Sequence, residues 1–273
     1  ASRRETEAAR SLLAESAETR DKAVQALMVE GVIAGDGPAT ALVAQLVTPG
    51  DRFPDEVARI ALEQALITTR RWLGTREAVH IAQNDHGALL LAGSRVGGRP
   101  SPEVAAEHLD DGLRHATRGL DSVQRTVVGI GQPRVRLADA VESYGEALHA
   151  ARVGVQLSAL GRVISWSGLG IYRVLSRLDR QYLDMSGVHP GLERLLRDRA
   201  NPVLLQTLER YLDLAGNAHA TAQQLRLHRT TLYYRLQRIE ELAGTDLKDG
   251  NERLCLHLAL KLARLNGQYR PEG

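Results

Sequence analysis

The spacing of apolar residues changes along the chain and divides its 273 residues into three segments. In residues 3–33, apolar side chains recur at mixed intervals of three and four, which predicts a helix with one apolar seam: Leu12, Leu13, Val24, Leu27, Met28 and Val32. Residues 35–38 contain two glycines and a proline that end this helix, and residues 40–47 predict a short second one. The seam fits packing on its own domain or pairing with a second copy, because the heptads are too few to identify a coiled coil.

Residues 57–166 indicate alternating strands and helices. Strands are predicted over 57–62, 78–82, 88–92, 126–130 and 162–166, and helices over 65–73, 102–120 and 137–160. A turn at residues 84–87 joins the second strand to the third. This order predicts an α+β or α/β sandwich in which one or two helical layers cover a central mixed sheet.

The remainder of the chain is predicted to be helical. Helices are expected over 171–183, 192–199, 202–214 and 251–265, with two shorter ones inside 221–242. The glycine and proline within residues 187–190 mark a domain boundary. In the last helix, leucines form two separate stripes: Leu254, Leu258, Leu262 and Leu265 on one, and Leu256 and Leu260 on the other. One face can pack within its domain and the other can meet a partner subunit or the middle domain.

The stretch 221–242, TAQQLRLHRTTLYYRLQRIEEL, has the pattern of a helix-turn-helix. Ala222 and Leu225 are spaced to form the inner face of a short first helix, and residues 226–228 form the break. In the second helix, three apolar residues at i, i+4 and i+7 form one stripe: Leu232, Leu236 and Ile239. Two such helices form a geometry that docks on DNA.

The face opposite that stripe carries hydrogen-bonding groups and positive charge. At 100° per residue, Thr230, Tyr234 and Gln237 point outward, and Tyr233 and Arg238 lie beside them. Residues 218–239 contain four arginines and no Asp or Glu, whereas the whole chain has a net charge of only +2. Attraction to phosphates explains this cluster. The predicted DNA-binding residues are His228, Arg229, Thr230, Thr231, Tyr233, Tyr234, Arg235, Gln237 and Arg238.

These residues resemble the C-terminal helix-turn-helix of the PucR/CdaR family of bacterial transcription regulators, which is similar to the Fis type. The run HRTTLYYRL is close to the family's HRNTLxYRL, with Thr230 in place of the family's Asn. Upstream, VVGIGQP and LADAVESYGEALHAARVG are similar to the family's GGDEF-like domain. The resemblance implies a helical connector over 1–50, a degenerate GGDEF-like sandwich over 51–184 and an all-α DNA-binding domain over 185–273. It also implies a sensor domain upstream, so the sequence is expected to be the distal part of a longer chain.

A working GGDEF site needs carboxylates that hold magnesium and glycines that let the backbone approach phosphate. The turn at 84–87 retains Asp85 and Gly87, and Glu63 is expected at the end of the first strand. These groups are too few, so we expect no catalysis, cofactor or metal. The alternative is a nucleotide-binding or nucleotide-cyclase-like GGDEF protein. A further alternative is an adaptor whose basic helix binds an acidic protein. If the turn at 84–87 instead forms a surface for contacts between subunits or domains, Asn84, Asp85 and Gly87 are expected to supply the left-handed conformations of a short loop.

The expected partners are double-stranded DNA and a second copy of the chain, as a homodimer or higher oligomer, because paired half-sites increase specificity. A small-molecule effector is a further expected partner. The lone Cys255 rules out an intrachain disulfide and is expected to pack inside the last helix. No apolar run is long enough to cross a bilayer, so we expect no membrane partner and a cytoplasmic location.

Overall fold

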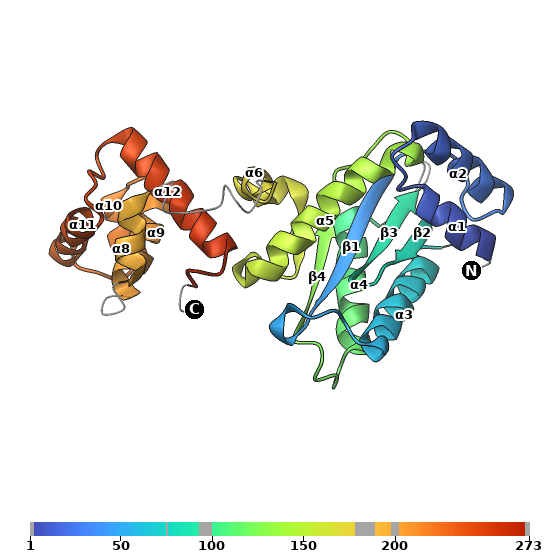
Figure 1. Ribbon diagram of the computed structural model, residues 1–273, viewed down its shortest axis with the longest axis horizontal. Coiled ribbons are helices and arrows are strands. Elements are labelled where there is room, and N and C mark those ends of the chain that lie inside the picture. Colours follow the sequence, from blue (N-terminus) through green and yellow to red (C-terminus); the bar gives the residue numbers. More distant parts are fainter. Residues whose placement is uncertain (1–2, 75, 93–99, 178–188, 198–201, 271–273) are drawn as a thin grey trace. The chain divides into compact units, whose positions relative to one another are not determined.

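The computed structural model describes residues 3–74, 76–92, 100–177, 189–197 and 202–270. The chain divides into two compact units, residues 1–173 and residues 174–273. The first unit is a mixed sheet with helices on both faces, and the described residues of the second unit form helices and turns (Figure 1). The predicted fold class, an α+β sandwich followed by an all-α helix-turn-helix region, is therefore confirmed.

Five strands form the sheet in the order β2-β3-β1-β4-β5. They are β1 (Ala39–Val47), β2 (Ala78–Ala82), β3 (His86–Ala92), β4 (Arg125–Ile130) and β5 (Val163–Ser165). β4 and β5 run parallel, whereas the other neighbouring pairs are antiparallel, so the prediction of a mixed sheet is confirmed. The strands predicted at 78–82, 88–92, 126–130 and 162–166 are all present, with ends shifted by one or two residues.

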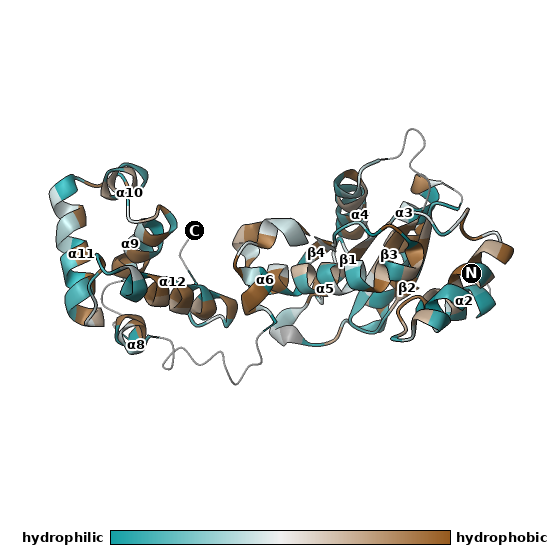
Figure 2. Ribbon diagram, turned by 90° about the horizontal axis from the view of Figure 1, so that it is seen from above, coloured by the Kyte–Doolittle hydropathy of each residue, from teal (hydrophilic) through white to brown (hydrophobic). Residues whose placement is uncertain are grey.

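Helices cover both faces of the sheet. α3 (Glu56–Leu73) and α4 (Pro102–Ala116) lie on one face, and α5 (Ala140–Gln156) lies on the other (Figure 1 and Figure 2). The shorter helices are α1 (Arg3–Ser11), α2 (Ala17–Val29) and α6 (Tyr172–Leu175), with 3-10 turns at Pro49–Asp51, Leu137–Asp139, Ser158–Leu160 and Trp166–Leu169. The core under α3 and α4 contains an apolar cluster that includes Leu42, Leu62, Leu66, Leu89, Leu109, Leu113 and Val128. The sheet therefore forms the middle of a three-layer sandwich.

Two secondary-structure predictions near the start of this unit are wrong. Residues 40–47, predicted to be helical, form β1, which lies at the centre of the sheet between β3 and β4. Alanine and leucine favour helices in isolation. Because β1 is buried on both faces, however, it has a continuous apolar run and no alternation to reveal it. The expected connector over residues 1–50 thus contributes the central strand.

The second error lies just beyond it, where residues 57–62 were expected to form a strand. They form the first turns of α3, whose N-terminus is capped by Asp55, with the Asp55 carboxylate accepting a 2.8 Å hydrogen bond from the backbone N–H of Ala58. That cap is the sequence signal that the strand prediction overlooked. Glu63 consequently lies on the exposed face of a helix and not at the end of a strand.

The predicted N-terminal helix over 3–33 is divided into α1 and α2, with Ser16 as the N-cap of α2. Leu12, Val24 and Leu27 are buried inside the first unit. Of the two uses that the sequence left open for the seam, packing on its own domain is the one observed.

Contact between α5 and the sheet depends on two glycines of the β4 region. A methyl group on Gly129 would lie 2.0 Å from the carbonyl oxygen of Ala147, and one on Gly131 would lie 2.0 Å from the carbonyl oxygen of Ser143. Both neighbours are backbone atoms of α5, so the helix backbone rests directly on the strand. The buried Ser143 hydroxyl also accepts a 3.0 Å hydrogen bond from the N–H of Ala41. Ser143 thus helps to hold α5 on the sheet.

The second unit consists of α8 (Pro190–Arg197), α9 (Pro202–Asp213), α10 (Ala218–Gln224), α11 (Arg229–Ala243) and α12 (Gly250–Leu265). The expected domain boundary at 184/185 and residues 178–183 of the helix expected at 171–183 lie outside the described residues, and within 171–177 only Tyr172–Leu175 form a helix, α6. Ion pairs join α9 to α12: Glu209 lies 2.6 Å from Arg264, and Asp213 lies 2.7 Å from Lys261 and 2.9 Å from His257. Burial alone would raise the pKa of Asp213, but hydrogen bonds from His257 and Lys261 lower it to about 2.

Two properties of the described residues complete the fold. Cys255 is exposed on α12, so the expectation that it packs in the interior is wrong. The interior face of α12 is formed by Leu256, Ala259, Leu260 and Ala263. None of the helices described here is both long enough and apolar enough to cross a lipid bilayer.

Candidate nucleic-acid interface

Local sequence fixes the ends of the two motif helices. α10 begins after Asn217, whose side-chain oxygen accepts a 3.0 Å hydrogen bond from the N–H of Ala220. α11 begins after His228, whose Nδ1 accepts from the N–H of Thr230, and ends at Gly244 in the left-handed conformation, with a φ of 61°. Polar N-caps and a left-handed glycine beyond the C-terminus are the common stop and start signals of helices.

The break between α10 and α11 contains a strained residue. Arg226 has a φ of 53°, a conformation that costs a side chain other than glycine about 1 kcal/mol. The N–H of Leu227 donates a 2.8 Å hydrogen bond to the carbonyl of Ala222, which closes the turn. Leu227 is the apolar residue of this break, and its side chain is half-buried.

The predicted inner stripe of α11 is confirmed, since Leu232, Leu236 and Ile239 are all buried. The inner face of α10 differs from the prediction. Ala222 and Leu225 are only half-buried, and the fully buried residue is Thr221, whose hydroxyl donates a 2.7 Å hydrogen bond to the carbonyl of Asn217. A buried threonine was missed because its polar hydroxyl satisfies itself within the helix, which the apolar pattern does not reveal.

The opposite face of α11 is open to solvent over its full length. Eight of the nine predicted DNA-binding residues are exposed: His228, Arg229, Thr230, Thr231, Tyr233, Tyr234, Gln237 and Arg238. Exposed tyrosines are notable here because aromatic rings usually contribute to cores or to interfaces. The structure therefore gathers these residues on one continuous surface.

Arg235 is the exception. Its side chain is half-buried, and Nη1 donates a 3.1 Å hydrogen bond to the hydroxyl of Thr207 on α9. This contact ties α11 to the helix behind it, so Arg235 has a structural role in addition to its charge. Sequence spacing could not reveal it because Thr207 lies 28 residues away.

Two of the exposed residues share one carboxylate. Glu241 accepts a 3.3 Å hydrogen bond from Gln237 and forms a 3.0 Å ion pair with Arg238. Glu241 lies just beyond the acid-free stretch and was not singled out from the sequence. Its position one turn along the same helix makes it a competitor for any phosphate or base that these side chains contact.

His228 and Thr230 also contact each other. The Thr230 hydroxyl and the His228 Nδ1 lie 2.8 Å apart. Because Nδ1 accepts from the N–H of Thr230, the hydrogen-bond network assigns the ring proton to Nε2. An Nε2–H at the N-terminus of α11 is suited to donate to a phosphate oxygen, where the helix dipole also favours negative charge.

In the first unit, the hairpin between β2 and β3 carries a chain of three polar side chains. Asp85 lies 2.7 Å from Nδ1 of His86, and the hydroxyl of Tyr144 on α5 lies 2.6 Å from its Nε2. Burial, and then the charge of Asp85, raise the pKa of Tyr144. The Asp85 carboxylate therefore orients a buried histidine that links the hairpin to α5.

The same hairpin differs from expectation in its backbone. Asn84, Asp85 and Gly87 all lack the positive φ that was predicted for them. Gly87 is instead part of β3, where a methyl group would lie 2.5 Å from Leu66. Within the described part of the chain, no three His, Cys, Asp or Glu side chains are grouped so that they could hold a metal.

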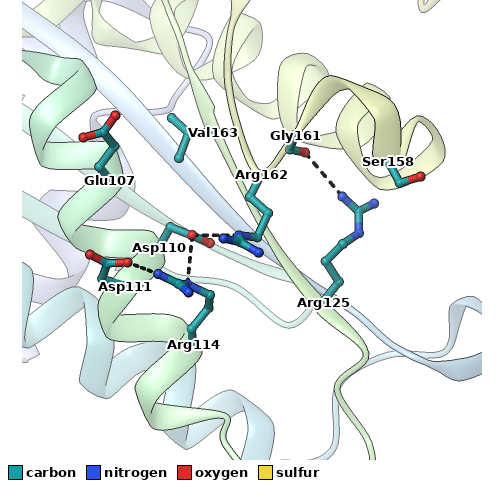
Figure 3. A pocket seen from close by; sticks show the side chains of 9 residues that line it. All are labelled: Glu107, Asp110, Asp111, Arg114, Arg125, Ser158, Gly161, Arg162 and Val163. Atoms are coloured by element: carbon teal, nitrogen blue, oxygen red, sulfur yellow. Dashed lines mark hydrogen bonds and ion pairs between the residues drawn. The ribbon is translucent and has the colours of Figure 1, made fainter. Parts of the chain in front are cut away.

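A pocket of about 620 Å³ lies where α4 meets β4 and β5 (Figure 3). Three arginines and three carboxylates line it, together with Ser158, Gly161 and Val163: Arg114, Arg125, Arg162, Glu107, Asp110 and Asp111. Asp110 pairs with Arg162 at 3.0 Å and with Arg114 at 3.3 Å. Arg125 donates to the carbonyls of Gly154 and Val155 at the end of α5. The arginines thus mainly stabilise the fold.

The geometry defines the class of protein: a helix-turn-helix with an open basic face, in one chain with a mixed α/β sandwich. Comparison with protein families agrees. Residues 17–153, about half of the chain, match the GGDEF-like domain, and residues 204–262 match the PucR C-terminal helix-turn-helix domain. The chain belongs to the family of PucR/CdaR-type regulators, and the resemblance inferred from the sequence is confirmed.

Curated relatives agree with this assignment. The DNA-binding transcriptional activator AdeR of Bacillus subtilis is 31% identical over 127 residues, which cover 45% of this chain and 30% of AdeR. The proline-responsive transcriptional activator PutR of the same organism is 26% identical over 209 residues, 75% of this chain and 50% of PutR. The purine catabolism regulatory protein of that organism is 45% identical over 62 residues, 23% of this chain and 12% of that protein. The chain spans half or less of the length of these relatives.

Proposed function

We propose that this protein is a sequence-specific DNA-binding transcription regulator and that α11 is its recognition helix. The observation that carries the proposal is the open face of α11, where three tyrosine and glutamine side chains stand among arginines on one surface: Tyr233, Tyr234 and Gln237. The relatives named as transcriptional activators support the same function. Because its target is DNA, we propose a cytoplasmic location.

We propose that the contacts divide into two kinds. Thr230, Tyr234, Gln237 and Arg238 face the base edges of the major groove, whereas His228, Arg229 and Arg235 hold phosphates on either side. Thr231 and Tyr233 lie between the two groups. Gln237 and Arg238 would first have to leave Glu241, so recognition includes an exchange of partners for this carboxylate.

The first test is the salt dependence of binding to a duplex obtained by binding-site selection. Each neutralised phosphate releases counterions, so the logarithm of the association constant is expected to fall linearly with the logarithm of the salt concentration, with a slope of about −0.9 per phosphate. Fluorescence anisotropy at several salt concentrations measures this slope. The Arg118→Ala variant, which removes an exposed arginine of the first unit, is the control and should leave the slope unchanged. Salt-independent binding, or preference for an acidic protein over DNA, would favour the adaptor alternative.

We propose further that the GGDEF-like sandwich is not catalytic and serves in dimerisation or signal relay. Two observations support this: Asp85 is engaged with His86, and Glu63 lies on the outer face of α3. Magnesium and a triphosphate require converging carboxylates and close backbone donors.

The second test is therefore incubation of the purified chain with GTP and magnesium or manganese. Chromatography is expected to detect no cyclic dinucleotide. The Asp85→Ala variant is expected to change DNA affinity by less than about twofold, because Asp85 belongs to the first unit and the proposed DNA-binding helix α11 belongs to the second. GTP turnover that is lost in Asp85→Ala would instead establish the nucleotide-cyclase-like alternative.

We also propose that the protein acts as a homodimer or higher homo-oligomer, since two helix-turn-helix motifs on two half-sites give far more specificity than one. The apolar seam of α1 and α2 is used within the first unit. On α12, Leu254 and Cys255 are exposed, whereas Leu262 is buried and Leu258 and Leu265 are half-buried, so only the first part of the predicted stripe is available to a partner. The signal would enter through an effector or a sensor domain.

A further inference from the structure

α3 carries a second apolar face that points away from the sheet. Its inner face, with Leu62 and Leu66, is part of the core. On the outer side, Phe53 is 77% exposed, Val57 58%, Ile60 52% and Trp72 45%. Val104 of the adjacent α4 is 46% exposed, and the ring of Trp72 stacks on that of His108 of α4 at 4.0 Å. These residues form the outer α3 face.

The spacing within α3 places its branched apolar residues on one side of the helix. Val57, Ile60 and Ile67 are separated by three and seven residues, so they lie on one side of a helix of 18 residues that is about 27 Å long. Val57 and Ile60 are exposed and Ile67 is half-buried, and the exposed polar side chains of Glu63 and Gln64 lie between the two isoleucines. A helix that packs on only one side normally has polar residues opposite its core stripe. Large apolar side chains grouped on the exposed side of a helix mark an interaction site.

The charges of α3 are arranged so that the stripe is complementary to itself. Glu56 is exposed at the N-terminal end, and Arg71 is exposed at the C-terminal end. Two copies of α3 that meet antiparallel would bring each acidic end against a basic end. An unrelated apolar partner would need no such arrangement.

We propose that two copies of this chain associate through the outer α3 face, with a two-fold axis passing between Glu63 and Gln64. In this register Ile60 meets the partner's Ile67, and Glu56 meets the partner's Arg71. Glu63 meets the partner's Gln64, which can donate a hydrogen bond to the carboxylate. Phe53 lies near the partner's Trp72, so the aromatic rings close both ends of the interface.

Such an interface is isologous, which is the geometry that closes a dimer and prevents open-ended assembly. Ile60 and Ile67 of both copies, with Val104 and the neighbouring side chains of α4, provide the apolar contacts on either side of the Glu63–Gln64 pairs, and the charges at the helix ends provide the rim, of an interface of about 800 Å² per partner. The inference rests on the proposed function, because a dimer supplies the two recognition helices that paired half-sites require.

The first experiment measures the mass of the full chain by sedimentation equilibrium at micromolar concentration. Wild type is expected to be a dimer, and Ile60→Asp is expected to raise the dimer dissociation constant by about 100-fold or more, since an apolar contact at the centre is replaced by buried charge in both copies. Val135→Asp is the matched control because Val135 is 81% exposed in the same unit but lies outside the outer α3 face. The control is expected to remain a dimer.

The second experiment reverses charges and does not depend on the apolar core. Glu56→Arg and Arg71→Glu each place like charges together at both ends and are expected to weaken the dimer by about tenfold or more. The variant with both substitutions restores opposite charges in every pair and is expected to recover most of the wild-type affinity. Circular dichroism melting of each variant separates loss of folding from loss of association.

Binding to DNA distinguishes failure of this inference from failure of the proposed function. Monomeric variants are expected to bind a duplex with one half-site as wild type does and to lose the advantage of a duplex with two half-sites. A monomeric wild type, or a dimer that survives Ile60→Asp and both single charge reversals, would overturn the inference. Neither of these outcomes would contradict the proposal that the protein binds DNA. Loss of all DNA binding in wild type would instead remove the proposed function.

Discussion

The Gly129→Ala variant is expected to lose about 3 kcal/mol or more of its free energy of unfolding. The added methyl group would lie 2.0 Å from the carbonyl oxygen of Ala147 and 2.7 Å from the backbone nitrogen of Ala151. Both atoms belong to the backbone of α5, so no side chain can rotate away and the whole helix would have to lift from β4. A domain has only about 5 to 15 kcal/mol of stability in total, so this unit should be largely compromised.

Urea unfolding followed by circular dichroism measures the effect. Gly145→Ala, on the facing helix α5, is the control. No neighbouring atom lies within 4 Å of its added methyl group, so the replacement is expected to raise the free energy of unfolding by about 0.5 to 1 kcal/mol through helix propensity. If Gly129→Ala were as stable as Gly145→Ala, α5 could not rest on β4 as closely as described. A change confined to the first unit should leave the unfolding of the helix-turn-helix unit unaltered.

The second large effect is expected on DNA recognition. Arg229→Ala should weaken binding to every duplex by a similar factor and make the salt slope less steep by about one unit, because a phosphate contact carries no sequence information. Gln237→Ala should cost about 1 to 3 kcal/mol at one base pair and relax specificity there. Both side chains are exposed, so neither change should unfold the unit.

Anisotropy titrations against the selected site and its single-base variants separate the two outcomes. Arg235→Ala is the informative comparison, since it removes one positive charge but also the hydrogen bond to Thr207. It should lower both the melting temperature and the affinity. If Arg229→Ala altered base preference while Gln237→Ala did not, the assignment of Gln237 to bases and of Arg229 to phosphates would be wrong.

Much of the helix-turn-helix could be predicted because its signals are local. The stripe of Leu232, Leu236 and Ile239 has a period of 3.6, and one rotation of the helix then assigns the outward residues. The order of strands and helices in the sandwich was also predictable from period and turns. The segments that failed were those in which local propensity and tertiary context disagree.

Residues 39–47 show that disagreement most clearly. Their alanines and leucines suit a helix, but hydrogen bonds to β3 and β4 on both sides make them the central strand. No pattern within nine residues reports on partners that are more than forty residues away. Because residues 57–62 were predicted to be the first strand, Glu63 was expected at a strand end. It lies within α3, whose start is marked by the capping carboxylate of Asp55.

The sequence by itself determined the fold class and the position of the helix-turn-helix, because apolar period, helix caps and the HRTTLYYRL motif are properties of neighbouring residues. Only the tertiary structure decided which apolar stripe is buried in the core and which remains exposed to solvent. Most of the seam of α1 and α2, including Leu12, Val24 and Leu27, is buried, whereas the outer α3 face and Leu254 of α12 are exposed. Sequence spacing gives the direction of a side chain around its own helix, whereas burial depends on what the rest of the chain brings against it.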